Sequence, residues 1–177
     1  MKDTNESVVG IVHTQILAEN LVLALKQSGF IDNDISVLFP DKEGTKDFAH
    51  ENSTKAPEGA VAGASTGGVV GGALGLLAGI GALAIPGVGP LIAAGPIMAA
   101  LSGAAVGATL GGVTGALVGL GIPEYEAKMY EGKIRDGNVL IAVHGFDGEQ
   151  LKRAEDIFKQ NSASDIHRVG EKAVQKK

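Results

Sequence analysis

The chain has 177 residues, a formal net charge of −5 at neutral pH and no cysteine. The lack of cysteine excludes disulfides, thiol chemistry and thiolate metal sites, and the acidic balance argues against nucleic acid as a partner. The polar N-terminus contains no apolar run before a cleavage site, so we expect no signal peptide and a cytoplasmic start.

Charged residues are absent from one long stretch of the chain. Residues 59–123 contain no charged side chain, and 19 of the 27 glycines lie among these 65 residues. The flanking sequence has the composition of an ordinary soluble domain. We therefore predict two parts: a split α/β domain formed by residues 1–57 and 123–177, and an inserted helical hairpin formed by residues 58–122.

The first charged part predicts a strand, a helix and a second strand. The β-branched run Ser7–Thr14 is typical of a buried strand. Apolar residues then follow helical spacing through QILAENLVLALKQSG, and Gly29 is placed to end that helix. Asp34–Pro40 predicts another strand, and the polar residues 41–57 predict a linker.

The second charged part predicts a helix, a strand, another helix and a weaker strand. Pro123 is placed to begin the first helix, which has acidic residues in its first turn. Asn138–Phe146 is the strongest strand pattern in the chain, and Asp147 is suited to cap the helix that follows. Asp165–Glu171 predicts the last strand.

Without the insertion and the helix that follows it, the order of elements is βαββαβ. This order is typical of a ferredoxin-like α+β fold. We therefore predict a ferredoxin-like domain interrupted by a long Gly/Ala-rich antiparallel helical hairpin between its second and third strands. We also expect the first and third strands to be parallel neighbours.

The insertion repeats glycine at every fourth position in two series. Two helices of about 25 residues, joined by the proline-rich turn IPGVGPLIAAGP, are the simplest structure for this pattern. A glycine costs roughly 0.8–1.0 kcal/mol in a helix interior, so six cost about 5 kcal/mol. Close helix packing would offset that cost. We predict that these glycines pack helices and drive self-association: Gly59, Gly63, Gly67, Gly71, Gly75, Gly79, Gly103, Gly107, Gly111, Gly115 and Gly119.

The surface against which the hairpin packs is left open by the sequence. Each glycine series is long enough to cross a bilayer core of about 30 Å, and a hairpin would leave the charged domain on one side. Against insertion, tryptophan is absent and Gly and Ala outnumber the larger apolar residues. The alternatives are a soluble assembly whose hairpins bury one another, and burial within a single chain.

Several segments of the chain resemble parts of known bacterial proteins. VVGIVHTQILAENLVLALKQSGFIDNDISVL resembles the opening of the bacterial heat-induced general-stress-protein domain of the YflT type, and GIPEYEAKMYEGKIRDGNVLIAVH resembles the closing segment of its glycine-rich relatives. The glycine repeats are similar to glycine-zipper segments of bacterial membrane-associated proteins. The resemblance implies a stress-linked protein without an established reaction, and it supplies no catalytic residues.

Few residues in the sequence have the spacing expected of a catalytic, metal-binding or ligand-binding site. His13 and His144 end two predicted strands and could lie side by side near Asp147, as a ligand-binding, metal-binding or pH-sensitive pair. The more ordinary interpretation is two half-exposed histidines at strand ends. The glycine runs lack the GK[ST] of a phosphate loop, and Ser65 has no base nearby. We therefore predict no enzyme, no cofactor and no resident metal.

The leading hypothesis is a non-enzymatic, stress-associated protein that self-associates through glycine-zipper hairpins. These hairpins would enter or line a membrane, with the α/β domain on the cytoplasmic side of the bacterial inner membrane. The partners would then be other copies of the chain and lipid, and not nucleic acid. The second hypothesis is a soluble cytoplasmic ring or filament, and the third is a ligand-sensing ferredoxin-like module that uses the sheet near His13 and His144.

Overall fold

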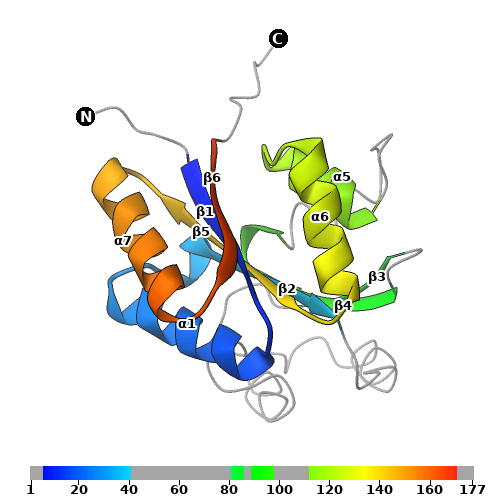
Figure 1. Cartoon of the computed structure of the whole chain (residues 1–177), viewed down its shortest axis with the longest axis horizontal. Helices are drawn as coiled ribbons and strands as arrows, with labels where there is room; N and C mark the ends of the chain where they lie inside the picture. Colours follow the sequence, from blue (N-terminus) through cyan, green and yellow to red (C-terminus); the bar gives the residue numbers. More distant parts are fainter. Residues whose placement is uncertain (1–5, 41–80, 86–88, 98–111, 171–177) are drawn as a thin grey trace, which may run out of the picture.

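The computed structural model describes residues 6–40, 81–85, 89–97 and 112–170 (Figure 1). These residues form a mixed α/β unit in which an antiparallel sheet lies between two layers of helices. Its elements in chain order are β1 (Glu6–Val12), α1 (Gln15–Gln27), the short 3₁₀ turn η1 (Asp32–Asp34), β2 (Ile35–Pro40), β3 (Gly81–Ile85), β4 (Gly89–Ala94), α5 (Gly112–Gly119), α6 (Glu124–Arg135), β5 (Val139–Gly145), α7 (Gly148–Gln160) and β6 (Ser164–Gly170).

The elements of the two charged parts begin and end where local sequence signals place them. The Thr14 side chain caps α1 by accepting a hydrogen bond from the Leu17 amide, and Gly29 follows the helix with a positive φ of 97°. The Asp147 side chain caps α7 by accepting from the Gln150 amide at 2.7 Å, which confirms the prediction for that residue. The predicted strands and helices here are confirmed, with bounds that differ by a residue or two.

The sheet has the strand order β3-β4-β2-β5-β1-β6, and every neighbouring pair is antiparallel. The first and third strands of the charged parts, β1 and β5, are therefore neighbours, as predicted, but the prediction that they are parallel is wrong. Their register pairs Ser7 with His144 and Val12 with Val139. The start of β1 thus lies beside the end of β5.

Part of the predicted helical hairpin is sheet. Residues 81–84, expected in the first long helix, belong to β3, and residues 89–94, expected in the turn, form β4. β4 pairs with β2, so it satisfies backbone groups that β2 would otherwise leave unpaired. Short apolar runs between prolines do not distinguish a buried strand from a helix by periodicity. Among the helices that the structure describes, none is both long and apolar enough to cross a bilayer.

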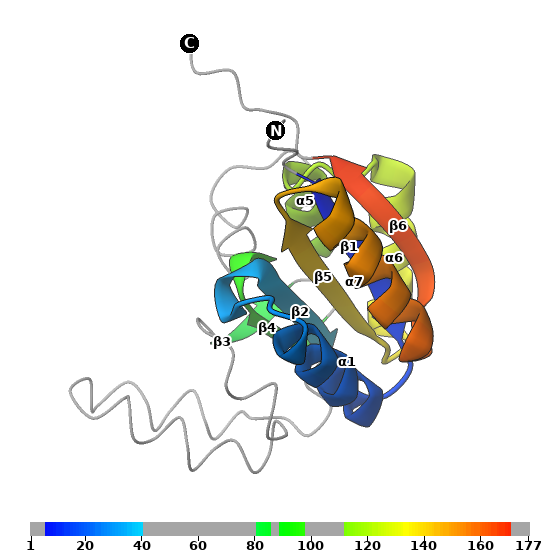
Figure 2. The ribbon, with the colours of Figure 1, turned by 90° about the vertical axis from the view of Figure 1, so that its left-hand side faces the viewer.

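Side chains alternate between the two faces of the sheet, and different helices cover each face (Figures 1 and 2). One face packs against α1 and α7, and we call it the α1/α7 face. The other packs against α5 and α6, and we call it the α5/α6 face. The α1/α7 face buries residues that include Val8, Val12, Ile35, Val37, Ile141 and Val143. The α5/α6 face buries residues that include Val9, Ile11, Leu38, Leu91, Ala93 and Leu140.

A glycine allows the chain to turn from β4 towards the α5/α6 face. Gly95 has a φ of +77°, and a Cβ placed there would lie 2.0 Å from the carbonyl oxygen of Ile35. The backbone of this turn therefore lies directly against β2, which no other residue type permits without displacement. The turn brings Ile97 into the core, where its amide donates a hydrogen bond to Ser36 Oγ at 3.2 Å.

Candidate functional site

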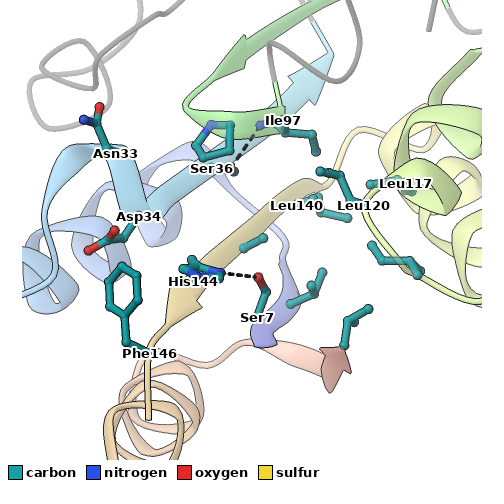
Figure 3. Close-up of a pocket in the computed structure, with 15 residues that line it drawn as sticks. Ser7, Asn33, Asp34, Ser36, Ile97, Leu117, Leu120, Leu140, His144 and Phe146 are labelled. Carbon is teal, nitrogen blue, oxygen red and sulfur yellow. Dashed lines mark hydrogen bonds between the residues drawn. The ribbon is translucent and has the colours of Figure 1, made fainter. Parts of the chain in front are cut away.

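A pocket of about 320 Å³ opens on the α5/α6 face, at the end of the sheet where β1 begins and β5 ends (Figure 3). Its polar lining residues come from β1, β5, η1 and the start of β2. Its apolar lining comes from the sheet, α5 and the segments that follow β4 and α5. The polar members are Ser7, Asn33, Asp34, Ser36 and His144, and the main apolar members are Val9, Leu117, Leu120, Ile122, Leu140 and Ala142.

Strand pairing brings the polar residues together. Ser7 and His144 lie directly opposite each other on β1 and β5, and a hydrogen bond joins Ser7 Oγ to His144 Nδ1 at 3.4 Å. On the other side of β5, Ile35 pairs with Val143, so Asp34 precedes β2 at the same end of the sheet. Three chain segments that are distant in sequence therefore contribute polar groups to one end of the pocket.

The surroundings of these groups define the mouth of the pocket. The Asp34 carboxylate accepts a hydrogen bond from the Ile31 amide at 3.3 Å, which closes the turn before β2. The Phe146 ring lies edge-on to His144, with 5.0 Å between the ring centroids, and the Phe146 side chain is 53% exposed. The mouth thus combines one carboxylate with an exposed aromatic ring.

The apolar wall formed by α5 is held in place by a carboxylate on α6. Both the amide and the hydroxyl of Thr114, in the first turn of α5, donate hydrogen bonds to Glu131 Oε2. The other Glu131 oxygen pairs with Arg135 at 2.9 Å. A carboxylate at a helix N-terminus satisfies amides that have no partner within the helix. Glu131 therefore positions α5.

His13 and His144 do not lie side by side, so the predicted pair is wrong. His13 follows β1 and its ring is hydrogen-bonded to the Asn138 side chain at 2.8 Å, at the start of β5. His144 lies near the other end of β5, about 20 Å away for six residues of strand. Antiparallel pairing causes this separation. Asp147 caps α7 and is not part of a histidine site, and the described residues contain no group of three potential ligands placed to hold a metal ion.

Most of the glycine series lies outside the described residues. This applies to Gly59, Gly63, Gly67, Gly71, Gly75, Gly79, Gly103, Gly107 and Gly111. Gly115 and Gly119 belong to α5. A Cβ at Gly119 would contact nothing within 4 Å, so this glycine does not serve close packing inside the described unit. The self-association expected of the series stays a prediction.

A second polar cluster joins α6 to the edge strand β6. The Tyr130 hydroxyl donates to the Asp165 carbonyl at 2.8 Å, and Lys133 forms an ion pair with the Asp165 carboxylate at 2.6 Å. Burial raises the pKa of the Tyr130 phenol above its usual range, and the Lys133 ammonium lowers the pKa of Asp165. Each polar group has a structural partner, so this cluster secures β6.

The pocket has the features of a binding site for a small molecule. Ser7 and His144 have the residue types of a nucleophile and its base. Their 3.4 Å separation is longer than the roughly 2.6–3.2 Å of an activated pair. Apolar walls with a few convergent polar groups are typical of a small-molecule site.

The sequence contains a partial signal for these residues. Period-two alternation places Ser7 on the same face as Val9 and Ile11, and Ser36 on the same face as Leu38. A polar residue at the end of an otherwise apolar face can be noticed in this way. Which strand ends meet depends on the pairing register, so Ser7 and Asp34 could not be assigned to the neighbourhood of His144 from sequence.

No protein-family model matches the chain, and comparison with curated proteins and with solved structures gave no match. The resemblance to bacterial stress proteins therefore remains a hypothesis that rests on the quoted segments.

Proposed function

We propose that the protein is a non-enzymatic, stress-associated protein that self-associates through its glycine-rich segments. In this proposal the α/β unit anchors those segments, and the assembly associates with the cytoplasmic side of the bacterial inner membrane. The α/β core is interpreted as a ferredoxin-like βαββαβ unit. The order β2-β5-β1-β6 and the antiparallel pairing of these strands support that interpretation.

One observation carries this proposal. The segment 41–80, which contains the first glycine series, follows Pro40 at the end of β2 and precedes Gly81 at the start of β3. β4 alone separates β2 from β3, so the two strands are about 10 Å apart in the sheet. Both ends of the segment are therefore attached at one region of a folded unit. An anchored segment that carries no charged side chain beyond residue 58 and contains period-four glycines is suited to contact other copies of the chain or lipid.

Gradient flotation of the full-length protein with lysed-cell membranes, without detergent, tests this proposal. We expect the wild-type protein to rise with the lipid and to resist an alkaline wash. Gly67→Leu should abolish self-association, measured by light scattering of the purified protein, because a leucine fills the groove that glycines leave for a partner helix. Gly148→Leu is the matched control, since a Cβ at Gly148 contacts nothing within 4 Å.

The outcomes separate the proposed alternatives. A large lipid-free particle that Gly67→Leu disperses would favour the soluble ring or filament over membrane association. A wild-type protein that remains monomeric would overturn self-association altogether. An equal loss of assembly in Gly67→Leu and Gly148→Leu would show that the period-four spacing is not the cause.

A further inference from the structure

We propose that the pocket on the α5/α6 face binds a small, mainly apolar molecule that carries an amino group. This inference goes beyond self-association, because the pocket is built from residues of the folded unit and uses none of the period-four glycines.

The size and lining of the pocket define the apolar part of the ligand. A volume of about 320 Å³ exceeds what a single ordered water requires, and it suits a molecule of roughly ten non-hydrogen atoms. Leu117, Leu120 and Ile122 form one wall, and Leu140 and Ala142 of β5 form the floor. An aromatic ring or a short aliphatic chain can be buried against these side chains.

The charge of the pocket lining indicates which polar group the ligand carries. Among the described residues that line the pocket, none is a lysine or an arginine, and Asp34 contributes a carboxylate. One Asp34 oxygen accepts the Ile31 amide, and a carboxylate can accept several hydrogen bonds. An ammonium group at this end gains a charge-assisted hydrogen bond, whereas a ligand carboxylate would be repelled.

The remaining polar groups lie beside the same end of the pocket. Ser7 and His144 are hydrogen-bonded to each other at 3.4 Å, and the Phe146 ring borders them at the mouth. An exposed aromatic ring beside a carboxylate favours a cationic group over an anionic one. The carboxylate, the aromatic ring and the apolar walls thus indicate the same chemical class, an amine with an apolar body.

The experiment is isothermal titration calorimetry on the full-length protein with three probes of matched size: 2-phenylethylamine, 2-phenylethanol and phenylacetate. We expect a Kd on the order of 1 mM for the amine, as usual for so small a ligand, and at least tenfold weaker binding of phenylacetate. Asp34→Asn should weaken the amine about fivefold and leave the alcohol unchanged, because asparagine keeps an acceptor for the Ile31 amide.

A pocket-filling variant tests the location. Ala142→Leu extends a side chain from the pocket floor and should weaken amine binding at least tenfold. Ala24→Leu, on α1 and on the opposite side of the sheet, is the control and should bind as the wild type does. Equal affinity for all three probes, binding of none of them, or wild-type affinity in Ala142→Leu would each overturn the inference. Light scattering on the same samples reports self-association separately, so the two proposals fail independently.

Discussion

The two faces of the sheet are built from the same strands but differ in how completely they are filled. On the α1/α7 face, Gly10 and Gly145 leave room for side chains of α7, because a Cβ at either would lie 2.8 Å from the side chain of Phe158 or Leu151. On the α5/α6 face, the same strands present Ser7, Ala142 and His144 to an open pocket. On the α1/α7 face, side chains of α7 pack directly against glycines of the sheet. On the α5/α6 face, a pocket is left between the sheet and the helices.

The difference follows from the helices that cover each face. α1 and α7 are amphipathic helices from the charged parts, each capped by its own preceding residue, Thr14 or Asp147. α5 comes from the uncharged region and is held through Glu131 of α6. α5 has only 8 residues, whereas α1 and α7 have 13 each, so α5 covers less of its face. Substitutions on the two faces should therefore have unequal effects.

The largest effect is expected at the turn that leads onto the α5/α6 face. Gly95→Ala places a methyl group 2.0 Å from the Ile35 carbonyl at a positive φ, so we expect a loss of about 3 kcal/mol or more in unfolding free energy. Urea denaturation measures it. Gly148→Ala, where the added methyl has open space, is the control. Similar stabilities for the two variants would contradict the close approach of this turn to β2.

A comparison of two leucine truncations tests the unequal filling of the faces directly. Leu25→Ala on the fully buried side of α1 should cost about 2–5 kcal/mol, because the closed face cannot collapse around the missing volume. Leu117→Ala, which is as fully buried on α5 and lines the pocket, should cost only about 2 kcal/mol, since space beside it already exists. Thermal and urea unfolding measure both. Equal losses would show that the pocket end is packed as tightly as the α1/α7 face.

The dependence of α5 on α6 can be tested at Glu131. Glu131→Ala removes the acceptor for two Thr114 groups and should cost about 1–2 kcal/mol. Hydrogen exchange should become faster in α5 and remain unchanged in α7. Glu124→Ala is the matched control on the same helix, because it breaks only the exposed pair with Lys128 and should change stability little. Unchanged exchange in α5 would contradict the capping role.

The smallest effect is expected for the ion pair that joins Asp165 of β6 to Lys133 of α6. The Lys133 ammonium lowers the pKa of Asp165 in the folded state below its ordinary 3.8. The pair therefore stabilises the fold above that value, and the contribution is lost as the pH falls through the lowered pKa. Asp165→Asn should reduce stability at pH 7 by less than about 1 kcal/mol, and the difference from wild type should shrink steadily as the pH falls below 3.8.

Asparagine suits this test because Asp165 has a φ of +49°, a conformation that asparagine also tolerates. Asp156→Asn, at an exposed position on α7, is the control. A destabilisation in Asp165→Asn that does not shrink as the pH falls below 3.8 would assign the effect to backbone strain instead of charge.

The elements of the charged parts could be predicted because their signals are local. The helical spacing of apolar residues, the cap at Asp147 and the glycine after α1 each act within one or two turns of chain. Residues 81–97 lack such signals, since their apolar runs are short and bounded by prolines and glycines. The helix predicted up to residue 84 and the turn predicted for residues 85–96 were wrong because β2 offered an unpaired edge, which is a property of the folded sheet.

The residues of the candidate site could likewise be predicted only as far as local signals reach. By itself the sequence determined which residues share a face of each strand, because alternation is fixed by backbone geometry. It therefore placed Ser7 with Val9 and marked His144 as the end of a strand. Only the tertiary structure decided that β1 and β5 run antiparallel, which separates His13 from His144 and brings Ser7 and Asp34 to the same end as His144. Pairing direction depends on contacts between residues more than 100 positions apart, and no local pattern encodes it.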